Sequence, residues 1–411
     1  MASRLIAFVG GLVVLVAACG TVGPPSARAP VPATSGDAAS TTTPTTATAP
    51  TIAVYTIPTL PEVPVRRSFT MAFTGDFLLH NRVISTAAAH AAGGEAVDGE
   101  AAAPARAYDF RPLLEPIRPW VERADWAVCH MEVNLSADGT RLSPFPMFRS
   151  PGEIAFDAAD LGYDACTTAS NHVLDQGLDG VAETLGVLDA AGLRSTGSAR
   201  TATEAHDQVW FRIGGVKVAH LSYSYGFNGF SIPDEAPWTT RLIDERAILR
   251  TAAEARSAGA EYVVLSLHWG NQYLHRASSQ QADLGPRLLA SPDIDLIIGH
   301  HAHVVQPIER IDGEWLVYGL GNLLANYVQA PRRDELLVEA SVTEQPDGTF
   351  TTDLTAVPLV VDRNTLTVYP THPTHRPPDL PPGLAAELDA SFARVLAVLD
   401  DGSGRDALRF E

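Results

Sequence analysis

Basic residues are scarce in this chain of 411 residues. Lys and Arg together number 29 against 48 Asp and Glu, which gives a formal net charge of −19. A chain this acidic repels a phosphate backbone, so we expect no nucleic-acid partner. Internal repeats are absent, and 45% hydrophobic with 19% charged residues is the composition of a globular protein. A fibre and a coiled coil are therefore excluded.

The apolar run that begins at Leu5 is too short to span a membrane stably. One positive charge precedes it and small residues follow it, as in an export signal. The sequence Val-Ala-Ala before Cys19 resembles the lipobox of bacterial lipoproteins, in which the cysteine is acylated and becomes the first residue of the mature chain. We therefore expect residues 1–19 to be a lipoprotein signal peptide, with lipidated Cys19 anchoring the exported protein to the outer face of the cell membrane. The alternative is cleavage after an A-x-A-like site, with Cys19 discarded.

Charged and large apolar residues are almost absent from residues 20–66, where Thr, Pro and Ala dominate. Such a stretch cannot bury enough apolar surface to offset the entropy of ordering it. We predict a disordered tether that holds a folded domain away from a membrane. An inert, O-glycosylated spacer is compatible with the same role.

Cysteine is also scarce, with three in all. Cys129 and Cys166 are an even pair in a chain expected to be exported, so a disulfide between them is permitted. Both lie in apolar segments typical of buried strands, where a small hydrophobic thiol is the commoner explanation. We therefore expect two free, buried thiols.

Beyond the tether, strand-like and helix-like segments alternate, and we expect helices over 112–123 and 153–161. Residues 261–267 and 294–298 are near-continuous apolar strands, as expected where both faces of a sheet are covered. This pattern predicts an α/β fold with layers on both sides of a sheet. Strands over 336–343 and 352–361 follow at hairpin-like spacing, which favours antiparallel pairing in the second half of the chain.

The domain boundaries follow from composition. We expect one folded domain over residues 67–365. Residues 366–411 form a Pro-rich segment and a C-terminal helix at about 384–399, where the apolar pattern is amphipathic.

Polar side chains cluster where five of the predicted strands end. The clusters are Gly75-Asp76, Glu132-Val133-Asn134, Ser170-Asn171-His172, His268-Trp269-Gly270 and Gly299-His300-His301-Ala302-His303. In open α/β sheets, ligands bind at this edge. Any one of these histidines alone would more often be a hydrogen-bonded loop residue. Together the imidazoles, the amide and the carboxylates supply the mixed N/O donor set of a divalent metal site, which we predict here.

The same clusters carry a family resemblance. The segments are Phe73–Asp76, His130–Asn134, Ala169–His172 with Asp175 and Gly177, Ser266–Gly270 and His301–Gln306, together with Tyr223–Gly229 and Tyr318–Asn322. Their types and order resemble the motif set of the bacterial capsule synthesis proteins of CapA type, which are linked with poly-γ-glutamate. The likeness spans about residues 68–330.

That family is similar to the calcineurin-like metallophosphatases. The resemblance therefore implies a four-layer α/β/β/α sandwich with mixed sheets and a site for divalent metal ions, two in number, such as Zn, Mn or Fe. It implies as metal ligands Asp76, Glu132, Asn171, His268, His301 and His303. It also implies that His172 is the general acid and that Asp175 orients it.

Two positions depart from the phosphoesterase pattern. Position 78 is Leu where that pattern has a histidine, and Glu132 stands where it has an aspartate. The nearest histidine, His80, is either a ligand, if the chain turns there, or a loop residue. We expect His300 to be a neighbour of the site and not a ligand.

Two classes of function follow from the resemblance. In the first, an enzyme acts in capsule or poly-γ-glutamate synthesis or processing, and hydrolyses or transfers a phosphoester or a γ-glutamyl amide. In the second, a non-catalytic module binds or exports a surface polymer, with the metal as a carboxylate receptor. The expected partner is an anionic polymer or a small phosphoester or γ-glutamyl substrate. A chain with a net charge of −19 repels polyglutamate at long range. Contact with the polymer therefore requires a metal or a local basic patch such as Arg332-Arg333. The other interpretation of this Arg pair is a solvated loop.

Overall fold

The computed structural model describes residues 66–93, 106–207, 210–400 and 402–411. These residues belong to one compact unit, Val63–Glu411. The expected signal peptide, Cys19 and nearly all of the expected tether lie outside the described residues. Among the described residues, no helix has both the length and the hydropathy that a membrane span requires.

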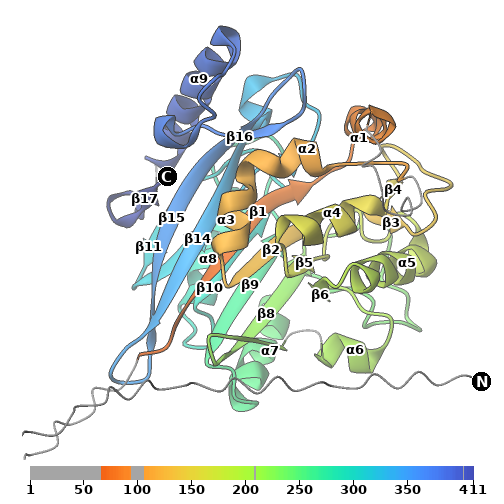
Figure 1. Ribbon diagram of the computed structural model, residues 1–411. Coiled ribbons are helices and arrows are strands. Elements are labelled where there is room, and N and C mark those ends of the chain that lie inside the picture. Colours follow the sequence, from red (N-terminus) through yellow and green to blue (C-terminus); the bar gives the residue numbers. More distant parts are fainter. Residues whose placement is uncertain (1–65, 94–105, 208–209, 401) are drawn as a thin grey trace, which may run out of the picture. The chain divides into compact units, whose positions relative to one another are not determined.

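The first of two large sheets contains nine strands (Figure 1). They are β1 (Ser68–Phe77), β2 (Trp126–Met131), β5 (Ala165–Thr167), β6 (Arg194–Thr196), β13 (Asn322–Leu324), β14 (Asp334–Glu344), β15 (Phe350–Val361), β16 (Val368–Pro370) and β17 (Arg409–Phe410). The order is β16-β15-β14-β1-β2-β5-β6, with β13 beside β1 and β17 beside β15. Strands β1, β2, β5 and β6 are parallel, whereas β14, β15 and β16 are antiparallel. The sheet is therefore mixed, and its second half is antiparallel as expected.

The second sheet contains six strands in the order β11-β12-β10-β9-β8-β7. They are β7 (Trp210–Ile213), β8 (Val216–Ser224), β9 (Tyr262–His268), β10 (Leu296–His300), β11 (Ile308–Ile311) and β12 (Glu314–Val317). The four central strands are parallel and the two edge strands antiparallel. A separate parallel pair joins β3 (Asn134–Ser136) to β4 (Arg149–Pro151).

Helices cover the outer face of each sheet. On the first sheet lie α1 (Asn81–Gly93), α2 (Arg111–Leu114), η1 (Glu115–Ile117), α3 (Arg118–Arg123), α4 (Glu153–Leu161) and α5 (Gly177–Ala190). Figure 1 shows α2 to α5 in front of that sheet. On the second sheet lie α7 (Glu245–Ser257) and α8 (Ser279–Leu289). The remaining helices are α6 (Ala202–Asp207), η2 (Ala330–Arg332), η3 (Pro373–His375), α9 (Pro382–Leu399) and η4 (Arg405–Ala407).

Three apolar cores separate four layers. Strand β9 shows how the sequence builds two of them, because alternate side chains of a strand point to opposite faces. Tyr262 and Val264 pack between the two sheets, whereas Val263 and Leu265 pack against α7 and α8. The third core lies between the first sheet and its helices. The α/β/β/α prediction is confirmed.

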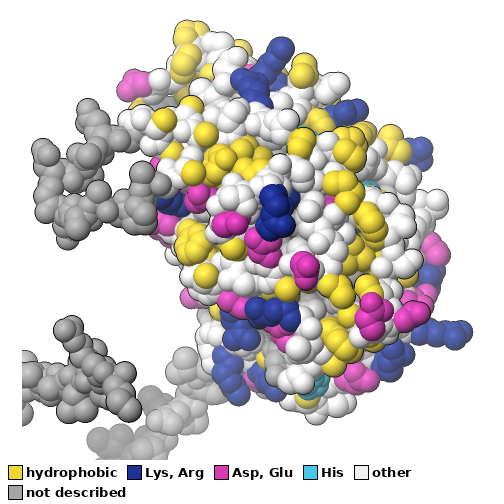
Figure 2. Space-filling model, turned by 90° about the vertical axis from the view of Figure 1, so that its right-hand side faces the viewer, with side chains coloured by type: hydrophobic (Ala, Val, Ile, Leu, Met, Phe, Trp, Pro, Cys, Tyr) yellow, Lys and Arg dark blue, Asp and Glu magenta, His cyan; other side chains and the backbone are white. Residues whose placement is uncertain are grey.

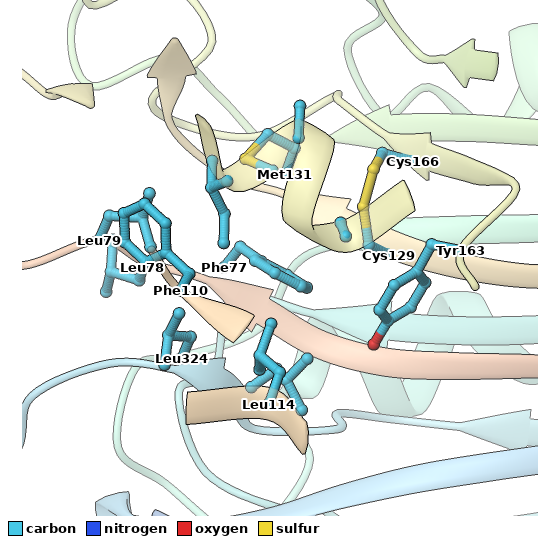
Figure 3. Close-up of a cluster of buried hydrophobic side chains, with 14 of the residues drawn as sticks. Phe77, Leu78, Leu79, Phe110, Leu114, Cys129, Met131, Tyr163, Cys166 and Leu324 are labelled. Carbon is cyan, nitrogen blue, oxygen red and sulfur yellow. A yellow bond between two sulfur atoms is a disulfide. The ribbon is translucent and has the colours of Figure 1, made fainter. Parts of the chain in front are cut away.

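The two cysteines of the folded domain form a disulfide, so the expectation of free thiols was wrong. Cys129 and Cys166 are buried, as expected, but they are direct register partners on the adjacent parallel strands β2 and β5. Their Cα atoms are 4.4 Å apart and their side chains leave the same face of the sheet, which allows the bond. Figure 3 shows the disulfide beside Tyr163 and Met131 in the helix-covered core.

Candidate metal centre

The predicted polar clusters meet at the carboxyl ends of strands from both sheets. Asp76 lies near the end of β1 and Glu132 directly after β2, while His268 ends β9 and His301 follows β10. All are at most 3% exposed. Only small areas of histidine are visible on the face shown in Figure 2, in keeping with this burial. The cluster is thus an internal site between the sheets.

One group of possible ligands contains Asp76, His130 and His268. Each offers one donor atom, and the three atoms lie within 4.8 Å of one another. A hydrogen bond of 2.9 Å joins His130 Nε2 to His268 Nδ1. On its other side, His130 Nδ1 is 2.7 Å from Thr167 Oγ1, which fixes the orientation of the ring.

A second group contains Glu132, His301 and His303, again with donor atoms within 4.8 Å of one another. Glu132 Oε1 lies 3.7 Å from His303 Nε2 and 3.9 Å from Nε2 of His268 in the first group. Glu132 therefore stands between the two groups, where a carboxylate could serve both. On the other side of its ring, His303 is oriented by a 2.8 Å hydrogen bond between its Nδ1 and Asn322 Oδ1.

Several of the candidate metal-ligating atoms in these groups have no hydrogen-bond partner among the described residues. These buried atoms are the two carboxylate oxygens of Glu132, Oδ1 of Asp76 and Nδ1 of His301. A buried carboxylate without a partner is costly, and native proteins rarely leave one so. The unused oxygens and nitrogens are the ligands that borderline divalent cations prefer. The residues present therefore fit metal ions.

The backbone of the histidine turn lies in an uncommon conformation. His301 and His303 have φ of 85° and 53°, in the left-handed region that residues other than glycine seldom adopt. Such a conformation costs about 1–3 kcal/mol per residue and persists only where the surroundings enforce it. Part of that enforcement is a 3.1 Å hydrogen bond from the backbone N–H of His301 to Asp76 Oδ2.

Asn171 and His172 lie side by side but contact different partners. Asn171 Oδ1 is 2.8 Å from His268 Nε2, so Asn171 adjoins the first group. His172 Nδ1 is 2.7 Å from Asp175 Oδ2, the oxygen that also accepts the backbone N–H of Phe148 at 2.7 Å. Asp175 thus fixes the imidazole of His172. Nε2 of His172 makes no hydrogen bond to a described residue.

Sequence reasoning overlooked His130 as a possible ligand. The signal was present, because His130 and Glu132 are two positions apart and alternate residues of a strand point to the same side. The phosphoesterase pattern has a histidine at position 78, where this chain has Leu. His130 instead supplies an imidazole near Asp76. Leu78 is buried in the helix-covered core.

His80 and His300 belong to neither group. His80 Nδ1 accepts the backbone N–H of Asn326 at 3.1 Å. His300 Nδ1 lies 3.2 Å from Asp76 Oδ1, and its ring stacks on that of His130 with centroids 4.1 Å apart. His300 is therefore a close neighbour of the first group.

Burial shapes the electrostatics of the site. It raises the pKa of the Glu132 carboxyl to about 7. Burial also disfavours the charged form of His303, but the adjacent carboxylates of Glu132 and Asp76 outweigh it and raise the pKa to about 9. The pKa of His301 falls to about 3, because burial disfavours its imidazolium.

We expect metal affinity to fall as the pH falls. Ligands must release their protons to bind a metal. With the pKa values above, His303 holds a proton below about pH 9 and Glu132 below about pH 7. Apparent affinity should therefore decrease about tenfold per pH unit between pH 9 and 7, and more steeply below pH 7. Competition with a chelator of known affinity would measure this, and constant affinity from pH 6 to 9 would contradict it.

The strand ends of both sheets converge on buried histidines and carboxylates, and they define an α/β protein with two adjacent groups of candidate metal ligands. The sequence profile of the bacterial capsule synthesis protein PGA_cap family matches residues 70–327, more than half of the chain and all of the groups described above. The chain belongs to this family.

Relatives of this chain carry names from capsule biology. The chain is 28% identical over 193 residues to the PGA biosynthesis protein CapA of Bacillus subtilis, covering 46% of this chain and 50% of that protein. It is 26% identical over 203 residues to the capsule biosynthesis protein CapA of Bacillus anthracis, covering 49% and 48%. The chain therefore spans about half the length of these two relatives.

Solved structures with a similar arrangement include two from bacteria. The calcineurin-like phosphoesterase YfkN from Bacillus subtilis aligns with a TM-score of 0.42 and 14% identity over 81% of this chain and 98% of that one. A 5'-nucleotidase precursor from Thermus thermophilus aligns with a TM-score of 0.40 and 14% identity over 80% and 59%. Both TM-scores are below 0.5, and the strand order and the three cores of this chain define its fold.

Proposed function

We propose that this protein is a metal-dependent hydrolase that acts in capsule or poly-γ-glutamate synthesis or processing. One observation carries the proposal: two groups of buried histidines and carboxylates meet at Glu132. Glu132 belongs to one group and lies 3.9 Å from His268 of the other, and its oxygens have no hydrogen-bond partner among the described residues. Such a carboxylate between two sets of imidazoles is suited to a pair of divalent ions. Membership of the PGA_cap family and the names of the two CapA relatives support the biological setting.

The ligands in this proposal come from both sheets. Asp76, His130 and His268 would hold one ion, and His301 and His303 would hold the other, with Glu132 between them. Asn171 would complete the first position, because its Oδ1 already lies against His268. When bound, such ions acidify water and polarise the group to be cleaved.

His172 is the proposed general acid. Its Nδ1–H donates to Asp175, so Nε2 is the nitrogen left to give a proton to a leaving group. Phe148 packs edge-on against the ring with centroids 4.8 Å apart, which further limits its motion. Asp175 would thereby act as a positioning residue and not as a ligand.

The proposed substrate is a phosphoester or a γ-glutamyl amide, alone or within an anionic polymer. Assays with a chromogenic phosphodiester and with a γ-glutamyl anilide would test this. We expect turnover of at least one, lost on chelation and restored by Mn²⁺ or Zn²⁺. Metal-dependent binding of polyglutamate without turnover of either substrate would instead favour a binding or export module.

We also propose that the protein is exported and held at the outer face of the cell membrane by lipidated Cys19. The apolar run and the Val-Ala-Ala sequence before Cys19 support this. Cys19→Ala should move the protein from the membrane fraction to the soluble exported fraction, with the thermal unfolding of the domain unchanged. Fractionation of cells that express either form would measure this, and unchanged membrane association would refute the lipid anchor.

A further inference from the structure

An arginine lies on aromatic side chains beside the metal centre. The guanidinium carbon of Arg332 lies 3.6 Å from the ring centroid of Tyr273 and 5.7 Å from that of Tyr327. Both are within the range of a cation–π interaction. The ring of Tyr273 is 5.9 Å from that of His303, and the ring of Tyr327 is 6.2 Å from it. Each tyrosine therefore lies close both to Arg332 and to a candidate ligand.

The backbone also connects this arginine to the histidine turn. The N–H of Tyr273 donates to the carbonyl of Ala302, between the two histidines, at 2.7 Å. The amide of Asn322 donates to the carbonyl of His303 at 3.3 Å and to that of Arg332 at 3.4 Å. The position of Arg332 is thus fixed relative to the candidate ligands.

The charge of Arg332 is not neutralised by a carboxylate of the described residues, since none lies within ion-pair distance of it. Its neighbour Arg333 differs. Arg333 is buried, donates to Glu387 at 3.0 Å and to the carbonyl of Val361 at 3.0 Å, and so stabilises the fold. Arg332 is partly exposed, so its guanidinium can meet a ligand from solvent.

We propose that Arg332 is a specificity-determining residue that binds an anionic oxygen group of the substrate at the metal centre. The proposal rests on the proposed function only in requiring that this site binds substrate. A guanidinium presents a planar fork of donors that matches two oxygens of a carboxylate or phosphate, and the tyrosines restrict the fork before binding. In a chain of net charge −19, a fixed cation beside the site provides the local attraction that an acidic substrate needs.

The ligand chemistry is shared by two sources, a free α-carboxylate of a γ-glutamyl chain and a phosphate. Equilibrium titrations of the full-length, Mn²⁺-loaded protein would separate them, with tri-γ-glutamate, its methyl ester and inorganic phosphate as probes. Arg332→Met keeps the length of the side chain and removes its charge. Arg194→Met is the matched control, because Arg194 also lies over an aromatic ring, that of Phe211 at 5.1 Å, but at the amino end of β6.

We expect Arg332→Met to weaken the binding of tri-γ-glutamate or of phosphate about tenfold, because a charge-assisted hydrogen bond is lost. The probe whose binding the substitution weakens identifies the source of the anion. The methyl ester should bind both variants equally, and Arg194→Met should match wild type with every probe. Elemental analysis would verify equal Mn²⁺ content.

The proposal is overturned if Arg332→Met binds both anions as wild type does, or if wild type binds neither at millimolar concentration. Turnover is not measured in these titrations. A protein that binds anions through Arg332 but hydrolyses nothing would therefore support the role of Arg332 and refute the hydrolase.

Discussion

Replacing His301 and His303 together by alanine is expected to remove most of the bound divalent metal. The two imidazoles belong to one ligand group with Glu132, and His303 Nε2 lies 3.7 Å from the carboxylate that stands between the groups. The histidines lie on a turn at the sheet edge and not within a strand, so the far-ultraviolet circular dichroism should stay near that of wild type. Elemental analysis of the purified variant would measure the loss.

The control for this variant is a second pair of histidines outside the site. The rings of His372 and His375 are 5.8 Å apart, and neither residue belongs to a ligand group. Changing both to alanine should leave the metal content at the wild-type level. Full metal occupancy after the loss of His301 and His303 would mean that the cluster is structural.

Changing His172 to alanine should lower turnover about 10²–10⁴-fold and leave the metal content unchanged. A general acid contributes to rate without holding the metal, whereas a ligand affects both. His172 contacts Asp175, Asn228 and Phe148, and it is in neither ligand group. His268→Ala, which removes a candidate ligand, should lose both metal and turnover.

A second variant separates proton transfer from simple packing at this position. Asp175→Asn keeps the shape of the side chain but replaces the carboxylate that orients His172. It should keep the metal and lose part of the turnover, with a changed pH profile on the basic side, where a general acid loses its proton. If His172→Ala releases metal as His268→Ala does, the assignment of His172 as the general acid is wrong.

Periodicity located most strands and several helices of this fold. The prediction of a helix over 153–161 matches α4 in both bounds, and the apolar strand expected at 261–267 is β9 shifted by one residue. The helix expected over 112–123 is instead broken into α2, η1 and α3, because Pro116 and Pro119 cannot donate backbone hydrogen bonds within a helix. Helix α1 was not predicted; alanine is its commonest residue, and only Val83 and Ala87 of it are buried.

The candidate site was predictable to the extent that its residues lie at the carboxyl ends of strands or directly after them. Asp76, Glu132 and His268 were found because the ends of parallel strands share one edge of a sheet. His130 was overlooked although it lies two positions before Glu132, because the His268 ring that it contacts comes from the other sheet and that contact is a property of the assembled fold. The disulfide was missed for a related reason, since the register that pairs Cys129 with Cys166 is a property of the assembled sheet.

The number of metal ions bound by the wild-type protein tests the central claim most directly. Elemental analysis of protein purified without chelator, then dialysed against metal-free buffer, would give it. The two ligand groups around Glu132 predict close to two divalent ions per chain, removed by a strong chelator and restored from Mn²⁺ or Zn²⁺. A protein that holds no divalent ion after purification, and takes up none when they are supplied at pH 8, would contradict the account.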